Sequence, residues 1–131
     1  MELLDSIEKK LTWFRENSHD CELPILMTCR DRLAVESYDL AKIVGNAQAD
    51  YNSAYFMRRI SISKTTNKLI KEGLAVSKAD VQSIEENEDK FKEEKDRESE
   101  AFFNSLLLKQ VNQVLSAMQQ RIALQRNELE S

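Results

Sequence analysis

The stretch KLIKEGLAVSKAD, residues 68–80, decides the fold, because it holds one of only two glycines in a chain of 131 residues. Lys71 suits the negative end of a helix, and Gly73 can adopt the left-handed conformation in which many helices end. Ser77 can cap a new helix, with Asp80 three residues later near the positive end of that helix. The stretch therefore predicts a helix end, a short turn and a helix start.

The composition agrees with long helices and few turns. Charged residues make up 32% of the chain, which contains a single proline, and such a composition is typical of long helices. The net charge of -4 argues against coating of DNA by the whole surface, although a local basic patch is compatible with it. Two cysteines are too few for a disulfide framework, the first residues do not resemble a signal peptide, and no apolar run is long enough for a membrane span. We expect a cytoplasmic protein with reduced thiols.

Apolar spacing predicts three helices around these breaks. Leu4, Ile7, Leu11 and Phe14 form one stripe near the beginning of the chain. A polar segment follows and ends at Pro24, which suits the first turn of a helix. We predict a single helical domain, 1–131, with a helix over 2–16, a loop over 17–24, a helix over 25–72, a turn over 73–76 and a helix over 77–130.

Each long helix has a predicted buried stripe. On the second helix it comprises Leu33, Leu40, Val44, Ala47, Tyr51, Ala54, Arg58, Ile62 and Leu69. The third helix has two stripes, one with Val81, Ile84, Phe91, Phe102 and Leu106, the other with Leu107, Val111, Leu115, Met118, Ile122 and Leu129. Gly45, inside the second helix, is interpreted as permitting a close helix approach or a slight bend.

The predicted fold is all-α: a short N-terminal helix plus a long antiparallel two-helix coiled-coil hairpin. Folding the chain at the turn places Leu33 near Ala117 and Leu40 near Gln110, and the first helix completes the core. Leu106, Leu107 and Leu108 point in more directions than one partner helix can cover, so we expect a homo-oligomer. Whether the hairpin closes within one chain or swaps between chains stays open.

A first candidate surface combines aromatic and basic side chains that can stack on bases and hold phosphates of single-stranded nucleic acid. Its members are Tyr51, Tyr55, Arg58, Arg59, Lys64 and Lys68. The alternative is structural: the aromatic rings pack on the third helix, and the arginines pair with Glu86, Asp89 and Glu93.

A second candidate surface lies in the acidic run EENEDKFKEEKDRESE, residues 85–100. Its members are Glu85, Glu86, Asp89, Glu93, Glu94 and Asp96. They can face a basic protein partner or imitate a nucleic-acid backbone, as an inhibitor of a host defence enzyme would. The alternative is a solvated helix face with pairs such as Glu86–Lys90, Glu88–Lys92 and Glu93–Arg97.

The chain shows no pattern typical of catalysis or of metal binding. His19, Asp20, Cys21 and Cys29 match no strong zinc spacing. Glycine-rich phosphate loops and metalloprotease motifs are absent from the sequence. We therefore predict a non-enzyme without a metal or cofactor. The first helix, with Trp13 and Phe14, could lie on a lipid surface, but docking on the hairpin is favoured.

Three segments carry a resemblance: AQADYNSAYFMRRISISK (47–64), KLIKEGLAVSKAD (68–80) and VLSAMQQRIALQRNE (114–128). Together they resemble small helical accessory proteins of tailed phages and prophages, of the kind encoded near recombination genes. The resemblance implies a phage protein, in the cytoplasm of a bacterial host, that acts in nucleic-acid metabolism or host interaction. The leading interpretation is a non-enzymatic protein that presents helix faces to a protein partner. The alternatives are a single-stranded nucleic-acid-binding accessory protein and an acidic inhibitor.

Overall fold

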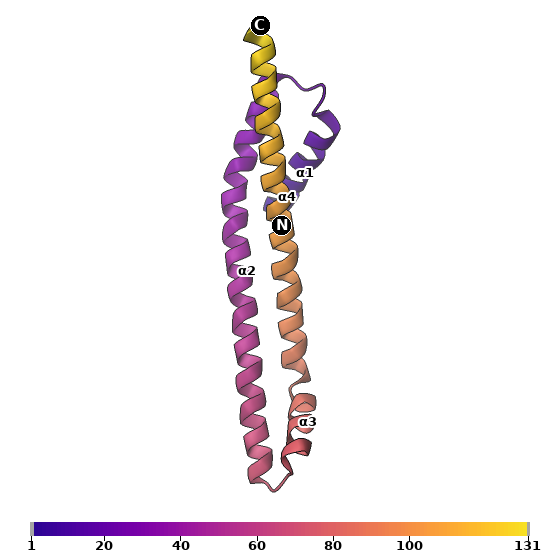
Figure 1. The fold of residues 1–131 in the computed structure, drawn as a ribbon, viewed down its shortest axis with the longest axis vertical. Helices are drawn as coiled ribbons and strands as arrows, with labels where there is room; N and C mark the ends of the chain where they lie inside the picture. Colours follow the sequence, from indigo (N-terminus) through magenta and orange to yellow (C-terminus); the bar gives the residue numbers. More distant parts are fainter. Residues whose placement is uncertain (1, 131) are drawn as a thin grey trace. The chain divides into compact units, whose positions relative to one another are not determined.

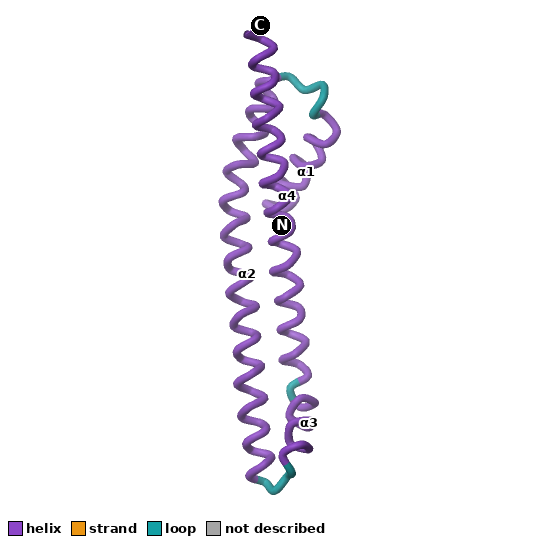
Figure 2. The backbone as a smooth tube through the Cα atoms, viewed as in Figure 1, coloured by secondary structure: helices purple, strands orange, loops and turns teal. Residues whose placement is uncertain are grey.

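The computed structural model describes residues 2–130, and within them it contains four helices and no strand (Figures 1 and 2). The helices are α1 (Glu2–Asn17), α2 (Leu23–Lys71), α3 (Val76–Glu86) and α4 (Glu88–Glu130). The predicted all-helical class is confirmed. The chain divides into two compact units: unit 1 comprises Met1–Val44 with Asn104–Ser131, and unit 2 comprises Gly45–Phe103.

Unit 1 has an apolar core to which three helices contribute. Its fully buried side chains are Ile7 of α1, Leu26, Leu33 and Leu40 of α2, and Val111, Met118 and Ile122 of α4. The predicted stripe of α1 packs here, since Leu4, Leu11 and Phe14 are half-buried against this core. Trp13 packs against the same core, so the most apolar face of α1 is covered by protein.

Polar side chains of α4 in unit 1 form hydrogen bonds with the loop that follows α1. Arg121 donates to the backbone oxygen of His19 (3.0 Å), and Gln125 donates to that of Cys21 (3.3 Å). These bonds join α4 to the loop between α1 and α2. Pro24 lies in the first turn of α2, as predicted, where its missing N–H costs nothing.

The turn after α2 is built around Gly73. Its φ of 101° lies in the region that glycine tolerates best, as the sequence predicts. The N–H of Gly73 donates to the carbonyl of Ile70 and that of Leu74 to the carbonyl of Leu69, both at 3.0 Å. This pair of bonds is a Schellman motif, which satisfies carbonyl groups at the end of α2.

The predicted role of Ser77 as the N-cap of the next helix is wrong. The N-cap is Ala75, whose backbone is extended and which offers no side-chain cap. The reason is that the reversal is already complete at Gly73, so α3 begins at Val76 and Ser77 lies exposed within its first turn.

The predicted continuous helix over 77–130 is interrupted at Asn87, between α3 and α4. The backbone N–H of Asn87 is shared between the carbonyls of Ser83 (3.1 Å) and Ile84 (3.2 Å), and its carbonyl accepts from Lys90 and Phe91. The Asn87 side chain also donates to the Ser83 carbonyl (2.7 Å). Asparagine competes in this way with regular helix hydrogen bonds, which explains a break without glycine or proline.

Burial along α2 follows the predicted stripe. Leu33, Leu40, Ala47 and Leu69 are buried, and the other predicted members are half-buried. The most buried positions recur every seven residues, at Leu26, Leu33, Leu40 and Ala47. The stripe changes in character along the helix, from leucine and valine in unit 1 to alanine, tyrosine, arginine, isoleucine and leucine in unit 2.

The two stripes predicted for the third helix differ in how well they agree with the observed burial. Val111, Met118 and Ile122 are buried, but Leu129 is exposed. The other stripe is wrong for four of its five members, because Val81, Ile84, Phe102 and Leu106 are exposed and only Phe91 is half-buried. The positions that replace them in unit 2 are small or polar: Ala79, Ser83, Asn87 and Ala101 are the buried residues. The core of unit 1 likewise holds Val111 and Met118 rather than the neighbouring Gln110 and Ala117.

Gly45 is exposed, and a Cβ atom there would meet no described atom within 4 Å. The interpretation that it permits a close helix approach is therefore wrong for the described residues.

Candidate interaction surface

Unit 2 has a polar core in which Asn87 is the central residue. The Ser61 hydroxyl donates to the Asn87 side-chain oxygen, and the Asn87 amide donates to the Thr65 hydroxyl (3.3 Å). Ser83, which is fully buried, donates to the backbone carbonyl of Ile62 (2.9 Å). These bonds connect α2 with α3 and with the break before α4. Each buried polar group has a partner, which is the condition under which such a core is stable.

Arg58 and Glu94 extend the polar core with an ion pair between α2 and α4. The Arg58 Nε donates to one Glu94 oxygen, and Arg58 Nη2 lies 3.3 Å from the other. Both side chains are largely buried, with exposures of 18% and 12%. The guanidinium carbon is 4.7 Å from the ring centre of Phe91 and 5.2 Å from that of Tyr55. The hydrogen bond to Glu94 raises the pKa of Arg58 above its usual value, so the guanidinium stays charged.

Large apolar side chains of unit 2 lie on its outside. On α2 these are Phe56, Met57, Ile60 and Ile70; on α3 they are Val76, Val81 and Ile84; on α4 they are Phe102 and Phe103. Phe56 is 59% exposed and Phe103 is 69% exposed. Unit 2 thus buries three alanines, one leucine, a serine and an asparagine, and its phenylalanine, isoleucine and methionine side chains at these positions are exposed, a small core for so many large apolar groups.

The six candidate nucleic-acid residues do not form one surface. Arg58 is occupied by Glu94, and the Tyr55 ring is contacted by Arg58 and by Arg59, whose Nη1 lies 3.2 Å from the Tyr55 hydroxyl. Lys64 is nine residues beyond Tyr55, and Lys68 is nine beyond Arg59. Nine residues make about two and a half helical turns. Lys64 therefore points away from Tyr55, and Lys68 points away from Arg59.

The helix geometry defines two outer sides of unit 2. The Tyr55 flank contains Tyr55 and Arg59 of α2 and, on α4, Phe91, Lys95, Glu98 and Phe102 at steps of four, three and four. The Met57 flank contains Met57, Lys64, Lys68 and Lys71 of α2 and, on α4, Asp89, Glu93, Asp96 and Glu100, again at helical steps. A hollow lined by Met57 and Glu93, with Asp50, Ser53, Ala54, Lys90 and Arg97, places these two helix stripes on one side.

The six candidate acidic residues also separate. Glu94 faces the polar core, whereas Asp89, Glu93 and Asp96 are exposed on the Met57 flank. Glu85 and Glu86 are exposed on α3. None of the three predicted pairs Glu86–Lys90, Glu88–Lys92 and Glu93–Arg97 forms among the described residues; the ion pair within α4 joins Arg97 to Glu100 at 3.6 Å. The acidic run therefore keeps most of its charge unpaired within the described chain.

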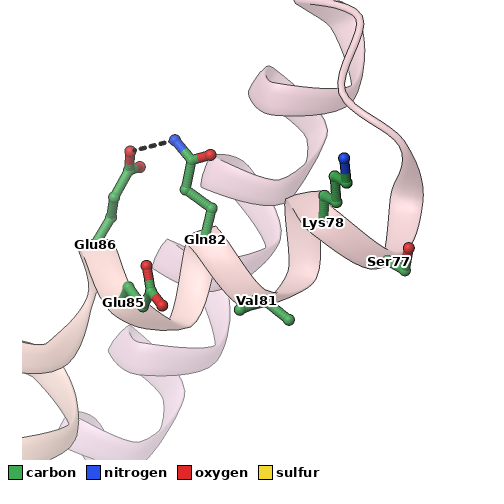
Figure 3. A pocket seen from close by; sticks show the side chains of 6 residues that line it. All are labelled: Ser77, Lys78, Val81, Gln82, Glu85 and Glu86. Carbon is green, nitrogen blue, oxygen red and sulfur yellow. Dashed lines mark hydrogen bonds between the residues drawn. The ribbon is translucent and has the colours of Figure 1, made fainter.

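The outer face of α3 carries only a shallow hollow. It is lined by Ser77, Lys78, Val81, Gln82, Glu85 and Glu86, all of one helix (Figure 3). Gln82 and Glu86 point towards each other and are hydrogen bonded at 3.1 Å (Figure 3). Because no second element covers it, this hollow is a feature of a helix surface rather than an enclosed ligand site.

The residues that the sequence analysis considered and rejected as zinc ligands lie in unit 1. His19 is exposed, and Cys21 and Cys29 are half-buried free thiols. Within residues 2–130 there is no group of three or more histidine, cysteine or carboxylate side chains placed to hold a metal ion. Burial raises the pKa of the Cys29 thiol, an effect that nearby Lys10 partly offsets.

Sequence reasoning missed the two residues that organise the polar core, Asn87 and Ser83. A signal for Asn87 exists in the spacing, since it lies seven residues before Glu94 and fourteen before Ala101 on the buried side of the chain. Apolar periodicity does not detect Asn87 or Glu94, because both side chains are polar. The partners of Asn87 on α2 are not encoded near it in the sequence, so their identity required the fold.

A comparison of the chain with protein-family models, with curated proteins and with solved structures finds no match. Over the described residues, no helix combines the length and the apolar character that crossing a membrane requires.

Proposed function

We propose that the chain is a non-enzymatic interaction protein that binds a protein partner through the Tyr55 flank of unit 2. One observation carries this proposal: unit 2 exposes large apolar side chains, Phe56 and Phe102 among them, while Ser83 and Asn87 take buried positions beside its small apolar residues. Exposed apolar groups that lie together mark protein interfaces, and tyrosine, phenylalanine and arginine are enriched at the centres of such interfaces.

The Tyr55 flank has the arrangement that such a contact needs. Phe56 packs edge-on against Tyr55, with ring centres 5.6 Å apart, and is largely exposed beyond this contact. The Arg58 guanidinium contacts the Tyr55 and Phe91 rings through cation–π interactions. Its ion pair with Glu94 fixes the guanidinium, so the aromatic side chains are ordered before a partner arrives, which reduces the entropy cost of binding.

The proposal includes an architecture. Unit 2 reverses the chain at Gly73, and α2 contacts both α3 and α4 through the polar core. With the seven-residue recurrence of buried positions on α2, these contacts support a coiled-coil hairpin. The exposed apolar groups support self-association, as the sequence predicts.

The setting of the protein is part of the same proposal. The resemblance of residues 47–64, 68–80 and 114–128 to accessory proteins of tailed phages supports a phage origin and the cytoplasm of a bacterial host. Binding of single-stranded nucleic acid has less support, because Arg58 is paired with Glu94 and Lys64 and Lys68 point away from Tyr55.

Photo-crosslinking in bacterial cells that express the chain tests the Tyr55 flank. A photoreactive phenylalanine analogue replaces Phe56 or Phe102, and the matched control replaces Tyr38, which is 75% exposed on the part of α2 that belongs to unit 1. The proposal expects one protein partner, joined at positions 56 and 102 and not at 38. Equal crosslinking at all three positions, or crosslinks to other copies of this chain alone, would contradict it.

A further inference from the structure

We propose that the partner docks on the Tyr55 flank with a carboxylate side chain that Arg59 of α2 and Lys95 of α4 bind together. The inference rests on the proposed function and names the chemistry of that same surface. The partner is a protein segment that carries an aspartate or a glutamate next to apolar side chains. The carboxylate fits the two cations, and the apolar side chains fit the aromatic rings beside them.

The first observation is that the two cations lie at nearly one level of unit 2. Arg58 of α2 and Glu94 of α4 form an ion pair, so these two residues face each other. Arg59 and Lys95 are the next residues along their helices, and both are exposed. In the proposed hairpin α2 and α4 run in opposite directions, so both residues turn about 100° from the ion pair to the same side and lie about 3 Å apart along the helix axes.

The second observation is that neither cation is neutralised within the described part of the chain. No ion pair joins Arg59 or Lys95 to a described carboxylate. The Arg59 guanidinium instead contacts Tyr55, with Nη1 3.2 Å from the hydroxyl and the guanidinium carbon 5.6 Å from the ring centre. Arg59 is therefore oriented on the flank and still available to an anion, so that binding a carboxylate orders its side chain little further.

The third observation is that the α2 side of the flank presents hydrogen-bond donors and no carboxylate. Between Tyr51 and Lys71 the chain contains no aspartate or glutamate. A hollow beside Arg59 is lined on α2 by hydroxyl and amide side chains that form no hydrogen bond with a described residue: Ser63, Thr66 and Asn67. These groups can donate to the same kind of oxygen that an arginine binds. This side of the flank therefore favours an acidic partner group over a basic one.

The carboxylates of the flank lie on the opposite side of the groove and specify what surrounds the partner's acid. Glu98 is one helical turn from Lys95 in one direction along α4, and Glu88 is two turns from it in the other. Asp80 of α3 lines the hollow opposite the α2 donors. The charge along the flank is thus negative, positive and negative, and a complementary segment has a basic residue on each side of its acid. A protein segment can supply this pattern, whereas the phosphates of a nucleic acid carry no cations.

Aromatic side chains lie on both sides of the two cations. On α4, Phe91 is four residues before Lys95 and Phe102 is seven residues after it. Phe102 is 60% exposed, and on α2 Phe56 is 59% exposed. A partner that covers these rings also shields the carboxylate contact from water, and a shielded charge contact contributes more to specificity than an exposed one.

Selection of peptides from a random library displayed on yeast tests this chemistry, with the selected peptide as the probe and the full chain as the bait. The reversed variant carries Arg59→Glu and Lys95→Glu. The control, Lys64→Glu with Lys68→Glu, makes the same charge change at exposed positions of the Met57 flank. A conservative variant, Arg59→Lys with Lys95→Arg, keeps both charges. Circular dichroism verifies that each variant keeps its helix content.

We expect the peptides selected by the unmodified chain to share an aspartate or a glutamate next to apolar side chains. Such a peptide should bind the reversed variant at least about tenfold more weakly, because carboxylates then face its own carboxylate, and should bind the control and the conservative variant within about threefold. The same peptide with its acid replaced by lysine should bind the reversed variant more tightly than it binds the unmodified chain. A purely structural effect of the substitutions would weaken the binding of both peptides, so this exchange of preference requires direct contact.

The proposal is overturned by a library that yields no binding peptide, by selected peptides that share no acid, or by equal binding to the unmodified and reversed chains. A single-stranded oligonucleotide that displaces the peptide and binds the unmodified chain as tightly also overturns it, because the two cations would then bind phosphates.

Crosslinking in cells separates this inference from the proposed function. If the photoreactive analogue at Phe56 joins one protein partner with equal yield in the unmodified chain and in the reversed variant, recognition of an acid is wrong while the partner site on the Tyr55 flank stands. A missing crosslink in the unmodified chain removes the proposed function and this inference with it.

Discussion

Replacing Glu94 with glutamine removes the charge that compensates Arg58 while it keeps the size of the side chain. The Arg58–Glu94 contact includes a 3.3 Å separation between Nη2 and an oxygen. At an effective dielectric constant near 20, two unit charges at this distance attract by about 5 kcal/mol. Desolvation of both groups, which are only 18% and 12% exposed, offsets most of this attraction.

The net effect follows from what each variant leaves behind. Glu94→Gln leaves Arg58 charged, largely buried and without its carboxylate, and we expect a loss of about 2 kcal/mol in the free energy of unfolding. Arg58→Met costs a similar amount, since it strands Glu94 and removes the cation–π contacts to Phe91 and Tyr55. The double variant Arg58→Met with Glu94→Met leaves no stranded charge, so its loss should be smaller than the sum of the single losses by about 1–2 kcal/mol.

Urea unfolding followed by far-ultraviolet circular dichroism measures these free energies. Tryptophan fluorescence provides a second probe, because Trp13 packs on the core of unit 1 and reports that unit. Hydrogen exchange of the amides between Ser53 and Thr65 reports unit 2 directly. Strict additivity of the two single losses, or single losses below about 0.5 kcal/mol, would refute the reasoning that the pair is coupled and shielded from water.

Four further outcomes can be measured. Gly73→Ala should destabilise the chain by about 1 kcal/mol because φ is 101° there, whereas Gly45→Ala should stabilise it by about 0.5–1 kcal/mol because the added methyl meets open space in a helix; opposite shifts in thermal midpoint check the pair. Leu33→Ala should cost about 2–5 kcal/mol in a urea titration, since Leu33 is fully buried. Alkylation of Cys29 should be slower in the folded chain than in denaturant at the same pH, because burial raises the thiol pKa and lowers the thiolate fraction; the difference should shrink as pH rises past the usual value of 9.0, and equal rates at neutral pH would contradict it. Single-stranded oligonucleotide should show weak retention on filters at low salt, and Arg59→Ala should change it little; tight binding that this substitution abolishes would revive the nucleic-acid interpretation.

Apolar periodicity predicted α2 well because the buried side of α2 is made of residues that periodicity detects or tolerates. Leu33, Leu40 and Ala47 are apolar, and Tyr51 and Arg58 were included by their spacing alone. The left-handed backbone conformation of Gly73 was equally predictable from the sequence, since few residues other than glycine adopt that conformation without strain. Local conformational rules and a regular apolar stripe therefore gave the helical class and the place of the reversal.

The same method failed for α3 and the first part of α4, where the buried residues are the small Ala79 and Ala101 and the polar Ser83 and Asn87. Val81, Ile84 and Phe102 were chosen as core because they are apolar, yet they are exposed. The buried Ser83 and Asn87 are stabilised by partners on α2, such as the Ile62 carbonyl and Ser61, that lie more than twenty residues away along the chain. Burial of a polar side chain depends on such partners, so a single helix read alone cannot reveal it.

The candidate surfaces were predicted as two lists of residues, one basic and aromatic and one acidic. In the structure neither list forms one surface, because one member of each, Arg58 and Glu94, faces inward. The remaining members lie on different sides of unit 2, because the position of a residue in the helical repeat sets the direction of its side chain. Residues that are close in the sequence can therefore face different sides, which a list of neighbouring residues does not show.

The polar core of unit 2 bears on which alignment of the helices is permitted. A seven-residue repeat lets one helix slide along another by a whole repeat with little change in the contacts of leucine or alanine. Such a slip would place Arg58 level with Ala101 or with Asn87 and leave Glu94 buried without a cation. Chains that carry Leu at positions 58, 87 and 94 should therefore be more stable against urea and yet populate several alignments, whereas the natural residues give up some stability and retain one.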